Sequence, residues 1–124
     1  MEHLKLLNNL NNDLFKFNNN FKSVKFFSKD IVNMKIWFII FISYYNNKNL
    51  HSEDIITKIP RECASRITVF RIIDDAVKKS FVLKTKNIND KRKFNIIPSI
   101  TTIKEFENWC LKFKNINNIK SKNI

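Results

Sequence analysis

The spacing of apolar residues predicts that most of this chain is helical. From Leu7 to Val24 the apolar residues recur at steps of three and four, which is the spacing of one helix face. We expect a helix over about residues 2–18, in which asparagine, a weak helix former, fills many of the other positions. The narrow stripe fits a dimer seam or packing against the chain's own core, and the pattern leaves both interpretations open.

A second helix is expected over about 29–46, with Ser28 as its N-cap. The middle of this helix, which includes the stretch Ile36–Ile42, is apolar on nearly every face, which is typical of a helix at the centre of a fold. Because this stretch is shorter than the roughly 20 residues that span a bilayer, it predicts a core helix and no membrane segment. The N-terminus, which Glu2 and Asp13 interrupt, does not resemble a signal peptide, so we expect a cytoplasmic protein.

Two helices separated by a tight turn follow. Ser52 is expected to cap a helix over about 53–59. Pro60 is expected to end this helix, because proline disfavours helical geometry in the residue before it. After a turn at 60–64, Ser65 is expected to cap a helix over about 66–79. This helix carries one apolar stripe that faces the core: Val69, Ile72, Ile73, Ala76 and Val77.

After residue 80 the pattern changes from helical to that of two short strands. The first strand is expected over 81–86 and the second over 94–97, ended by Pro98, with a polar turn at 87–91 between them. A short helix, a tight turn, a second helix and then a hairpin form the arrangement of a winged helix-turn-helix. We therefore predict a mainly α fold with a small β-hairpin wing.

The C-terminal segment is expected to form one more helix over about 102–114, where Thr102 and Glu105 have the spacing of a capping box. The length of 124 residues fits a single domain. This domain is predicted to begin with an N-terminal helical arm at residues 1–27, which is a candidate for dimerisation, followed by a DNA-binding core with its wing at 28–99. A C-terminal helix at 100–114 and a disordered tail at 115–124 complete the chain.

The charge of the chain favours a polyanionic partner, such as nucleic acid or an anionic membrane surface. The formal net charge is +12 at pH 7, although the abundance of Asn, Lys, Ile and Phe and the lack of Gly are also what an AT-rich coding sequence would give. The arginines carry more information, because all of them lie between Arg61 and Arg92. Arginine makes bidentate contacts with phosphate and guanine, so this segment is expected to meet nucleic acid.

The first turns of the helix at 66–79 carry the candidate DNA-reading side chains. A recognition helix enters the major groove with its N-terminal residues, where hydroxyls bond phosphates or bases and arginine contacts guanine. An ordinary amphipathic helix with a solvated charged face would show the same pattern. The candidate residues are Ser65, Arg66, Ile67, Thr68 and Arg71.

Basic residues on the hairpin favour the DNA-binding interpretation. A wing lies along the DNA backbone or inserts a basic side chain into the minor groove, and a charged tip that only keeps the hairpin soluble is the alternative. An aspartate two positions before the arginine of the tip is placed to pair with its guanidinium. The candidate wing residues are Lys84, Lys86, Asp90, Lys91, Arg92 and Lys93.

Residues of about 52–99 resemble the MarR family of bacterial winged-helix regulators. The stretch from Thr68 to Val82 is similar to that family's recognition helix and the entry to its wing, and Asp90–Lys93 is similar to its wing-tip signature. Ser80 stands where the family usually has glycine, and the two residues after the second strand are Pro-Ser where the family tends to have Leu-Thr.

The resemblance implies roles for individual residues. Thr68 and Arg71 would face DNA, Arg92 would reach the minor groove, and Asp90 would hold that arginine in place. The family forms dimers through its terminal helices, which here correspond to the helices expected at the two ends of the chain. The segment after the wing is shorter than the family's usual dimerisation region.

We therefore predict a homodimeric transcription regulator that binds specific double-stranded DNA sequences, with a winged-helix module for protein–protein interaction as the alternative. The sequence contains no Gly-rich phosphate loop, recognisable carboxylate pair or Cys–His pair that would indicate an enzyme. The spacing of Cys63, Cys110, His3 and His51 does not suit a metal site, and no cofactor or effector is indicated. Cys63 is expected to fill space in the core, with a redox sensor as the alternative.

Overall fold

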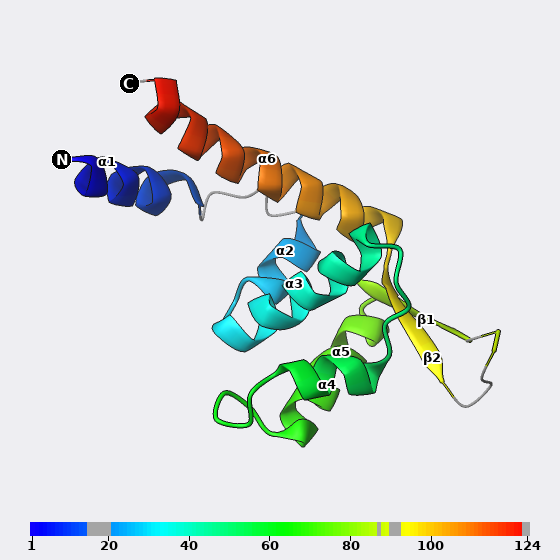
Figure 1. Ribbon diagram of the computed structural model, residues 1–124. Helices are drawn as coiled ribbons and strands as arrows, with labels where there is room; N and C mark the ends of the chain where they lie inside the picture. The colour runs from blue at the N-terminus through cyan, green and yellow to red at the C-terminus, as the bar shows by residue number, and fades with distance from the viewer. Residues whose placement is uncertain (15–20, 87, 90–92, 123–124) are drawn as a thin grey trace.

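Helices make up most of the described chain, and a two-stranded hairpin precedes the last of them (Figure 1). The computed structural model describes residues 1–14, 21–86, 88–89 and 93–122. The predicted fold class, mainly α with a small β-hairpin wing, is confirmed. The elements are α1 (Glu2–Asn9), a π-helical turn (Leu10–Leu14), α2 (Lys22–Phe27), α3 (Ile31–Tyr45), α4 (Ser52–Lys58), α5 (Arg66–Lys78), β1 (Val82–Lys86), β2 (Phe94–Pro98) and α6 (Ile100–Lys122).

Helix α3 lies at the centre of the fold, as its apolar sequence predicts. Its residues Ile36, Trp37 and Ile40 are buried. The Trp37 ring stacks on Phe27 of α2 with 5.8 Å between ring centroids, and it meets Phe106 of α6 edge-on at 4.9 Å. Aromatic residues from elements far apart in the sequence therefore cover the same helix.

Helix α2 is an element that the hydrophobic pattern did not predict. The helix expected over 2–18 is α-helical only to Asn9, and its predicted end lies outside the described residues. The separate helix α2 buries Val24 and Phe27, so it belongs to the core rather than to an N-terminal arm.

The predicted cap of α3 is also corrected. The Ser28 hydroxyl donates a hydrogen bond to the Val24 carbonyl at 2.6 Å, which places Ser28 at the end of α2. The N-cap of α3 is instead Asp30, whose carboxylate accepts a hydrogen bond from the Asn33 amide at 2.8 Å.

Helix α6 begins earlier and ends later than predicted. It runs from Ile100 to Lys122, where we expected a helix over 102–114 followed by a tail. Ser99 precedes it, and the Ser99 hydroxyl oxygen accepts a hydrogen bond from the Thr102 amide at 3.3 Å. The predicted cap at Thr102 is therefore wrong, and that residue is buried.

A buried carboxylate joins α6 to α2 instead of completing a capping box. Glu105 accepts hydrogen bonds from the Ser23 amide at 3.1 Å and from the Ser23 hydroxyl at 2.6 Å. Both side chains are almost fully buried. Hydrogen bonds to a charged group are among the stronger ones in proteins, so this pair fixes the start of α2 against α6.

Helices α4 and α5 pack against each other across a tight turn at residues 61–63, as predicted. Helix α4 is capped by His51 rather than by Ser52, because the Asp54 carboxylate accepts a hydrogen bond from the His51 amide at 2.9 Å. The predicted apolar stripe of α5 is confirmed, and its most buried members are Val69, Ile73 and Ala76.

The hairpin is antiparallel, with Val82 of β1 opposite Pro98 of β2 at its base. The residues that face the helices, Val82 and Ile96, are buried. The Ile96 amide donates a hydrogen bond to the Leu50 carbonyl at 2.7 Å. This bond attaches the hairpin to the segment that leads into α4.

Ser80 occupies a backbone position that favours glycine. Its φ is 61°, in the left-handed region. The Ser80 amide donates to the Val77 carbonyl at 3.0 Å, and the Phe81 amide donates to the Ala76 carbonyl at 2.9 Å. These are the two bonds of a Schellman motif, in which glycine is preferred at the position that Ser80 holds.

Replacement of Ser80 by glycine is expected to raise the free energy of unfolding by about 0.5–1 kcal/mol. Glycine avoids the steric cost of a left-handed residue with a Cβ atom, roughly 1–2 kcal/mol, and loses part of that gain as backbone entropy. Urea unfolding followed by circular dichroism measures the change. Asn47→Gly is the matched control, since Asn47 also has a positive φ of 54° but asparagine tolerates this region better. A Ser80→Gly variant no more stable than the wild type would contradict the interpretation.

Candidate nucleic-acid interface

Two hydroxyl side chains fix the first turn of α5. The Ser65 hydroxyl oxygen accepts a hydrogen bond from the Thr68 amide at 3.2 Å, which confirms Ser65 as the predicted N-cap. The hydroxyls of Ser65 and Thr68 also lie 3.0 Å apart, within hydrogen-bond distance. The two groups are therefore presented together at the surface.

The residues predicted to read DNA are all exposed in the first turns of α5. They lie away from the buried stripe of Val69 and Ile73. We call this set the α5 front, which consists of Ser65, Arg66, Ile67, Thr68 and Arg71. A ligand can therefore reach every one of these side chains.

Phe70 is an exposed residue of α5 that the sequence interpretation missed. Phe70 is 39% exposed, and Ile67 is 69% exposed. Residues three apart lie close together on a helix surface, so an outward Ile67 was a signal that Phe70 lies near the same face. Exposed apolar side chains beside arginine can contact thymine methyl groups or an apolar partner.

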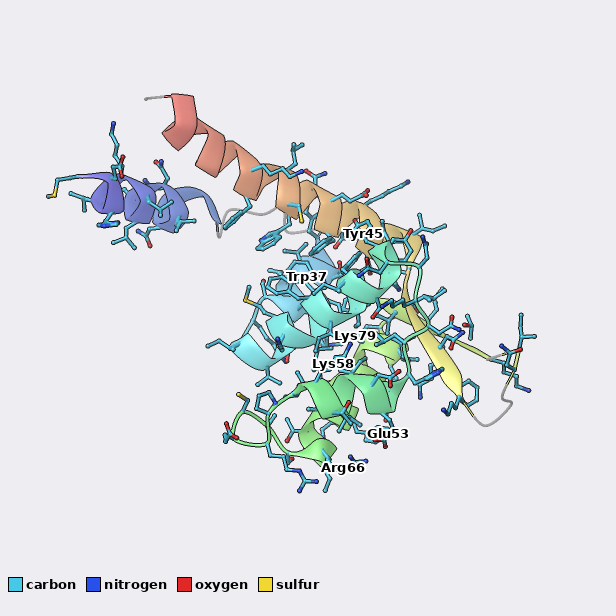
Figure 2. All side chains as sticks on the ribbon, viewed as in Figure 1. Trp37, Tyr45, Glu53, Lys58, Arg66 and Lys79 are labelled. Atoms are coloured by element: carbon cyan, nitrogen blue, oxygen red, sulfur yellow. The ribbon has the colours of Figure 1, made fainter. Side chains whose placement is uncertain are left out.

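Arg66 of the α5 front is paired with an acidic residue of α4. Its Nη2 atom lies 2.8 Å and 3.1 Å from the two carboxylate oxygens of Glu53. Figure 2 shows the two side chains at the exposed ends of α4 and α5. This ion pair joins the starts of the two helices.

The wing contacts α5 through one of its cations. The Lys84 ammonium lies 3.8 Å from an Asp74 carboxylate oxygen, which links the wing to the middle of α5. Lys86 and Lys93 are exposed. The remaining predicted wing residues lie outside the described residues, and their pairing stays a prediction: Asp90, Lys91 and Arg92.

The hairpin and the helix pair are also linked through His51. Its ring Nδ1 lies 3.2 Å from the Phe94 carbonyl oxygen at the start of β2. Together with the bond from Ile96 to Leu50, this contact holds the wing against the N-terminal end of α4. The wing and the helix-turn-helix therefore form one body.

Cys63 lies in the turn before α5, and its side chain is exposed. The expectation that it fills space in the core is therefore wrong. The turn is closed by a hydrogen bond from the Cys63 amide to the Pro60 carbonyl at 2.9 Å, so the backbone of this residue, rather than its thiol, has the structural role.

Two adjoining hollows lie between the end of α3 and α6, and both are lined by Tyr45 and Phe106. One has a volume of about 370 Å³ and is lined mainly by apolar side chains of α3, including Phe38 and Ile42. The other, of about 470 Å³, is lined by Tyr45 and by residues of α6 that include Leu111. These hollows lie on other elements than the α5 front.

Tyr45 is the most perturbed titratable group of this region. Its hydroxyl donates a hydrogen bond to the Glu107 carboxylate at 3.3 Å. Partial burial, followed by the negative charge and the hydrogen bond of Glu107, raises the pKa of Tyr45 to about 12. Burial also raises the pKa of the neighbouring Cys110 thiol. Both groups are therefore neutral near pH 7.

No helix in the described ranges has both the length and the apolar character needed to cross a membrane. In the same ranges, no three His, Cys, Asp or Glu side chains are grouped so that they could hold a metal ion.

The helix pair α4–α5 and the attached hairpin define a winged helix-turn-helix protein. Two solved structures of MepR from S. aureus have the same fold. A glycine-to-lysine mutant aligns with a TM-score of 0.57 and 16% identity over 98% of this chain and 75% of that chain. The selenomethionine derivative of a phenylalanine-to-leucine mutant aligns with a TM-score of 0.59 and 15% identity over 99% and 75%.

MepR is a MarR-family regulator, so the fold of this chain is of MarR type, as the resemblance over residues 52–99 implied. No protein-family model and no curated protein sequence matches the chain. At 15–16% identity, the similarity of this chain to the MepR structures concerns the fold alone.

Ionisation of Tyr45 is expected at unusually high pH. In a Tyr44→Phe variant, Tyr45 is the remaining tyrosine, and its absorbance at 295 nm should change with a midpoint near 12 rather than 10.0. Because the folded state holds this proton more tightly, the group contributes stability below pH 10, and that contribution is lost as the pH rises towards 12. Glu107→Gln should lower the midpoint. A midpoint near 10 with the helical dichroism intact would contradict the described contact.

Proposed function

We propose that this protein is a transcription regulator of MarR type that binds specific double-stranded DNA sequences. One observation supports this most directly: the exposed α5 front and the basic wing belong to one body, linked by the contact between Lys84 and Asp74 at 3.8 Å. A duplex presents a major groove to a helix and an adjacent minor groove to a wing, so both elements can engage one DNA molecule.

The proposed contacts divide between bases and backbone. Thr68 and Arg71 would reach base edges in the major groove, where arginine can make a bidentate contact with guanine. Lys86 and Lys93 would lie along the backbone, and Arg92 would enter the minor groove with Asp90 beside it. The net charge of +12 would give binding a steep dependence on salt, because each neutralised phosphate releases counterions.

We further propose that the regulator acts as a homodimer through its terminal helices. Helices α1 and α6 contact each other and extend beyond the body formed by the other elements (Figure 1). They leave large apolar side chains exposed, namely Leu4, Leu7, Leu111 and Phe113. A second copy would cover these residues and would place two recognition helices about one helical turn of DNA apart, roughly 34 Å.

The exposed Ile67 and Phe70 favour one second candidate function, a winged-helix module that binds a protein partner. Two large apolar side chains on an outward helix face are the kind of feature that protein interfaces use. Failure of the protein to retain any duplex at low salt would favour this candidate over DNA binding.

Selection of bound duplexes from a random pool is expected to yield a near-palindromic site. On that site, Arg71→Ala should reduce the preference over random DNA by about tenfold, since a good bidentate base contact contributes about 1–3 kcal/mol of discrimination. Lys86→Ala should weaken binding to both kinds of DNA alike and reduce the salt slope by about one unit. Fluorescence anisotropy titrations at several salt concentrations measure both effects.

The two variants serve as controls for each other, because each removes one exposed cation from the same body. Equal losses on the selected site and on random DNA for both variants would contradict the proposed division between base reading and backbone contact.

Introduction of a charge at the proposed dimer surface is expected to produce monomers. The double variant Leu7→Glu/Leu111→Glu would bury two carboxylates against a second copy, which is unfavourable. The affinity between the two copies should therefore fall by more than about tenfold. Ile100→Glu, at the opposite end of α6 and also exposed, should leave the dimer intact. Sedimentation equilibrium measures the assembly state, and a wild-type protein that is monomeric at micromolar concentration would rule out this dimer.

A further inference from the structure

The pairing of Glu53 with Arg66 leaves most of the arginine available to a ligand. Both carboxylate oxygens of Glu53 accept hydrogen bonds from one atom, Nη2, at 2.8 Å and 3.1 Å. The Nη1 and Nε groups of Arg66 take no part in these bonds. The guanidinium is therefore held from one side, and no bond to its other donors is seen among the described residues.

Arg66 and a second arginine line the cleft between α4 and α5. The cleft has a volume of about 150 Å³, and its lining includes Thr57 at the end of α4, Arg61 in the turn and Arg66 at the start of α5. Its inner wall is apolar and includes Ile56 and Val69. Two arginines line this small cleft, and arginine side chains suit a single anion with several oxygen acceptors.

The ion pair contributes little to the stability of the fold. The side chain of Arg66 is 46% exposed and that of Glu53 is 58% exposed, and ion pairs this accessible to water add little to stability. A carboxylate beside a DNA-binding surface also repels phosphates. The presence of the Glu53 carboxylate is explained if it restricts the rotamers of Arg66 before DNA binds. Without that restriction, the entropy lost when a long side chain is ordered opposes binding.

We propose that Glu53 is a positioning residue for DNA binding: it holds the Arg66 guanidinium beside the α4–α5 cleft, where Arg66 and Arg61 together receive one backbone phosphate. This inference rests on the proposed function. It assigns Arg66 to the backbone and leaves base reading to Thr68 and Arg71.

The direction in which removal of Glu53 changes the affinity for DNA distinguishes this proposal from simple electrostatic repulsion. If Glu53 only repels DNA, its removal tightens binding. If Glu53 positions Arg66, the Glu53→Ala variant loses about threefold to tenfold in affinity although the protein has become more positive, which corresponds to the cost of ordering one long side chain. The same substitution in an Arg66→Ala background is expected to cause no loss.

The experiment is a double-mutant cycle measured by fluorescence anisotropy on the selected duplex, with Glu53→Ala, Arg66→Ala and the double variant. Glu62→Ala is the matched control, since it removes one exposed acidic residue from the turn between the same two helices. It should bind as tightly as the wild type or more tightly. Circular dichroism melting checks that each variant is folded, and a second cycle with Glu53→Gln should give coupling of the same sign and smaller size.

A second measurement tests for the phosphate. Neutral methylphosphonate is substituted at one backbone position of the duplex at a time. At one position the wild type should lose affinity while Arg66→Ala loses none, and Arg66→Ala should lower the salt slope by about 0.9.

The outcomes separate the two proposals. A wild-type protein that binds no duplex rejects the proposed function and this inference together. A wild type that binds DNA while Glu53→Ala binds equally or more tightly overturns only the role of Glu53. A double-mutant cycle without coupling between Glu53 and Arg66 also overturns the role of Glu53. A methylphosphonate scan in which no position distinguishes the wild type from Arg66→Ala overturns the proposed phosphate contact.

Discussion

The burial of α3 is the constraint on which the other elements depend. A helix that is apolar on nearly every face can be stable in water only if neighbours cover it on several sides. Helices α2 and α4 and strand β2 all contact it, and the rings of Phe106 and Trp109 from α6 lie 4.9 Å and 5.1 Å from the ring of Trp37. The helix-turn-helix, the wing and the terminal helix are therefore placed relative to one another by their shared contact with α3.

Acidic residues near the proposed DNA-binding surface pair with its cations. Glu53 contacts Arg66 at the start of α5, and Asp74 contacts Lys84 at the root of the wing. Each pair joins two different elements of the fold. In a chain with a net charge of +12, the position of the charges, rather than their number, is what can distinguish one duplex site from another.

The long helix α6 has two roles in the fold. Its first turns complete the core through Phe106 and hold α2 through the buried Glu105. Its later turns extend past the core beside α1 (Figure 1). The same helix therefore packs in the core and contacts α1, so it joins the terminal helices to the winged body.

Much of the fold could be predicted from the sequence, because its signals are local. The cap at Ser65, the apolar stripe of α5 and the two strands of the wing each depend on residues within a few positions of one another. The exposed α5 front follows from the same periodicity, since the face opposite a buried stripe must meet solvent.

The sequence alone could not predict the contacts between elements. The spacing of Thr102 and Glu105 fits a capping box, yet Glu105 binds Ser23, which lies 82 positions away in the sequence. The short helix α2, the cap at Asp30 and the pairing of Arg66 with Glu53 were missed for a related reason. Helix periodicity is set by interactions along one segment, whereas the partner of a polar side chain is decided by which groups the packed core brings within hydrogen-bond distance.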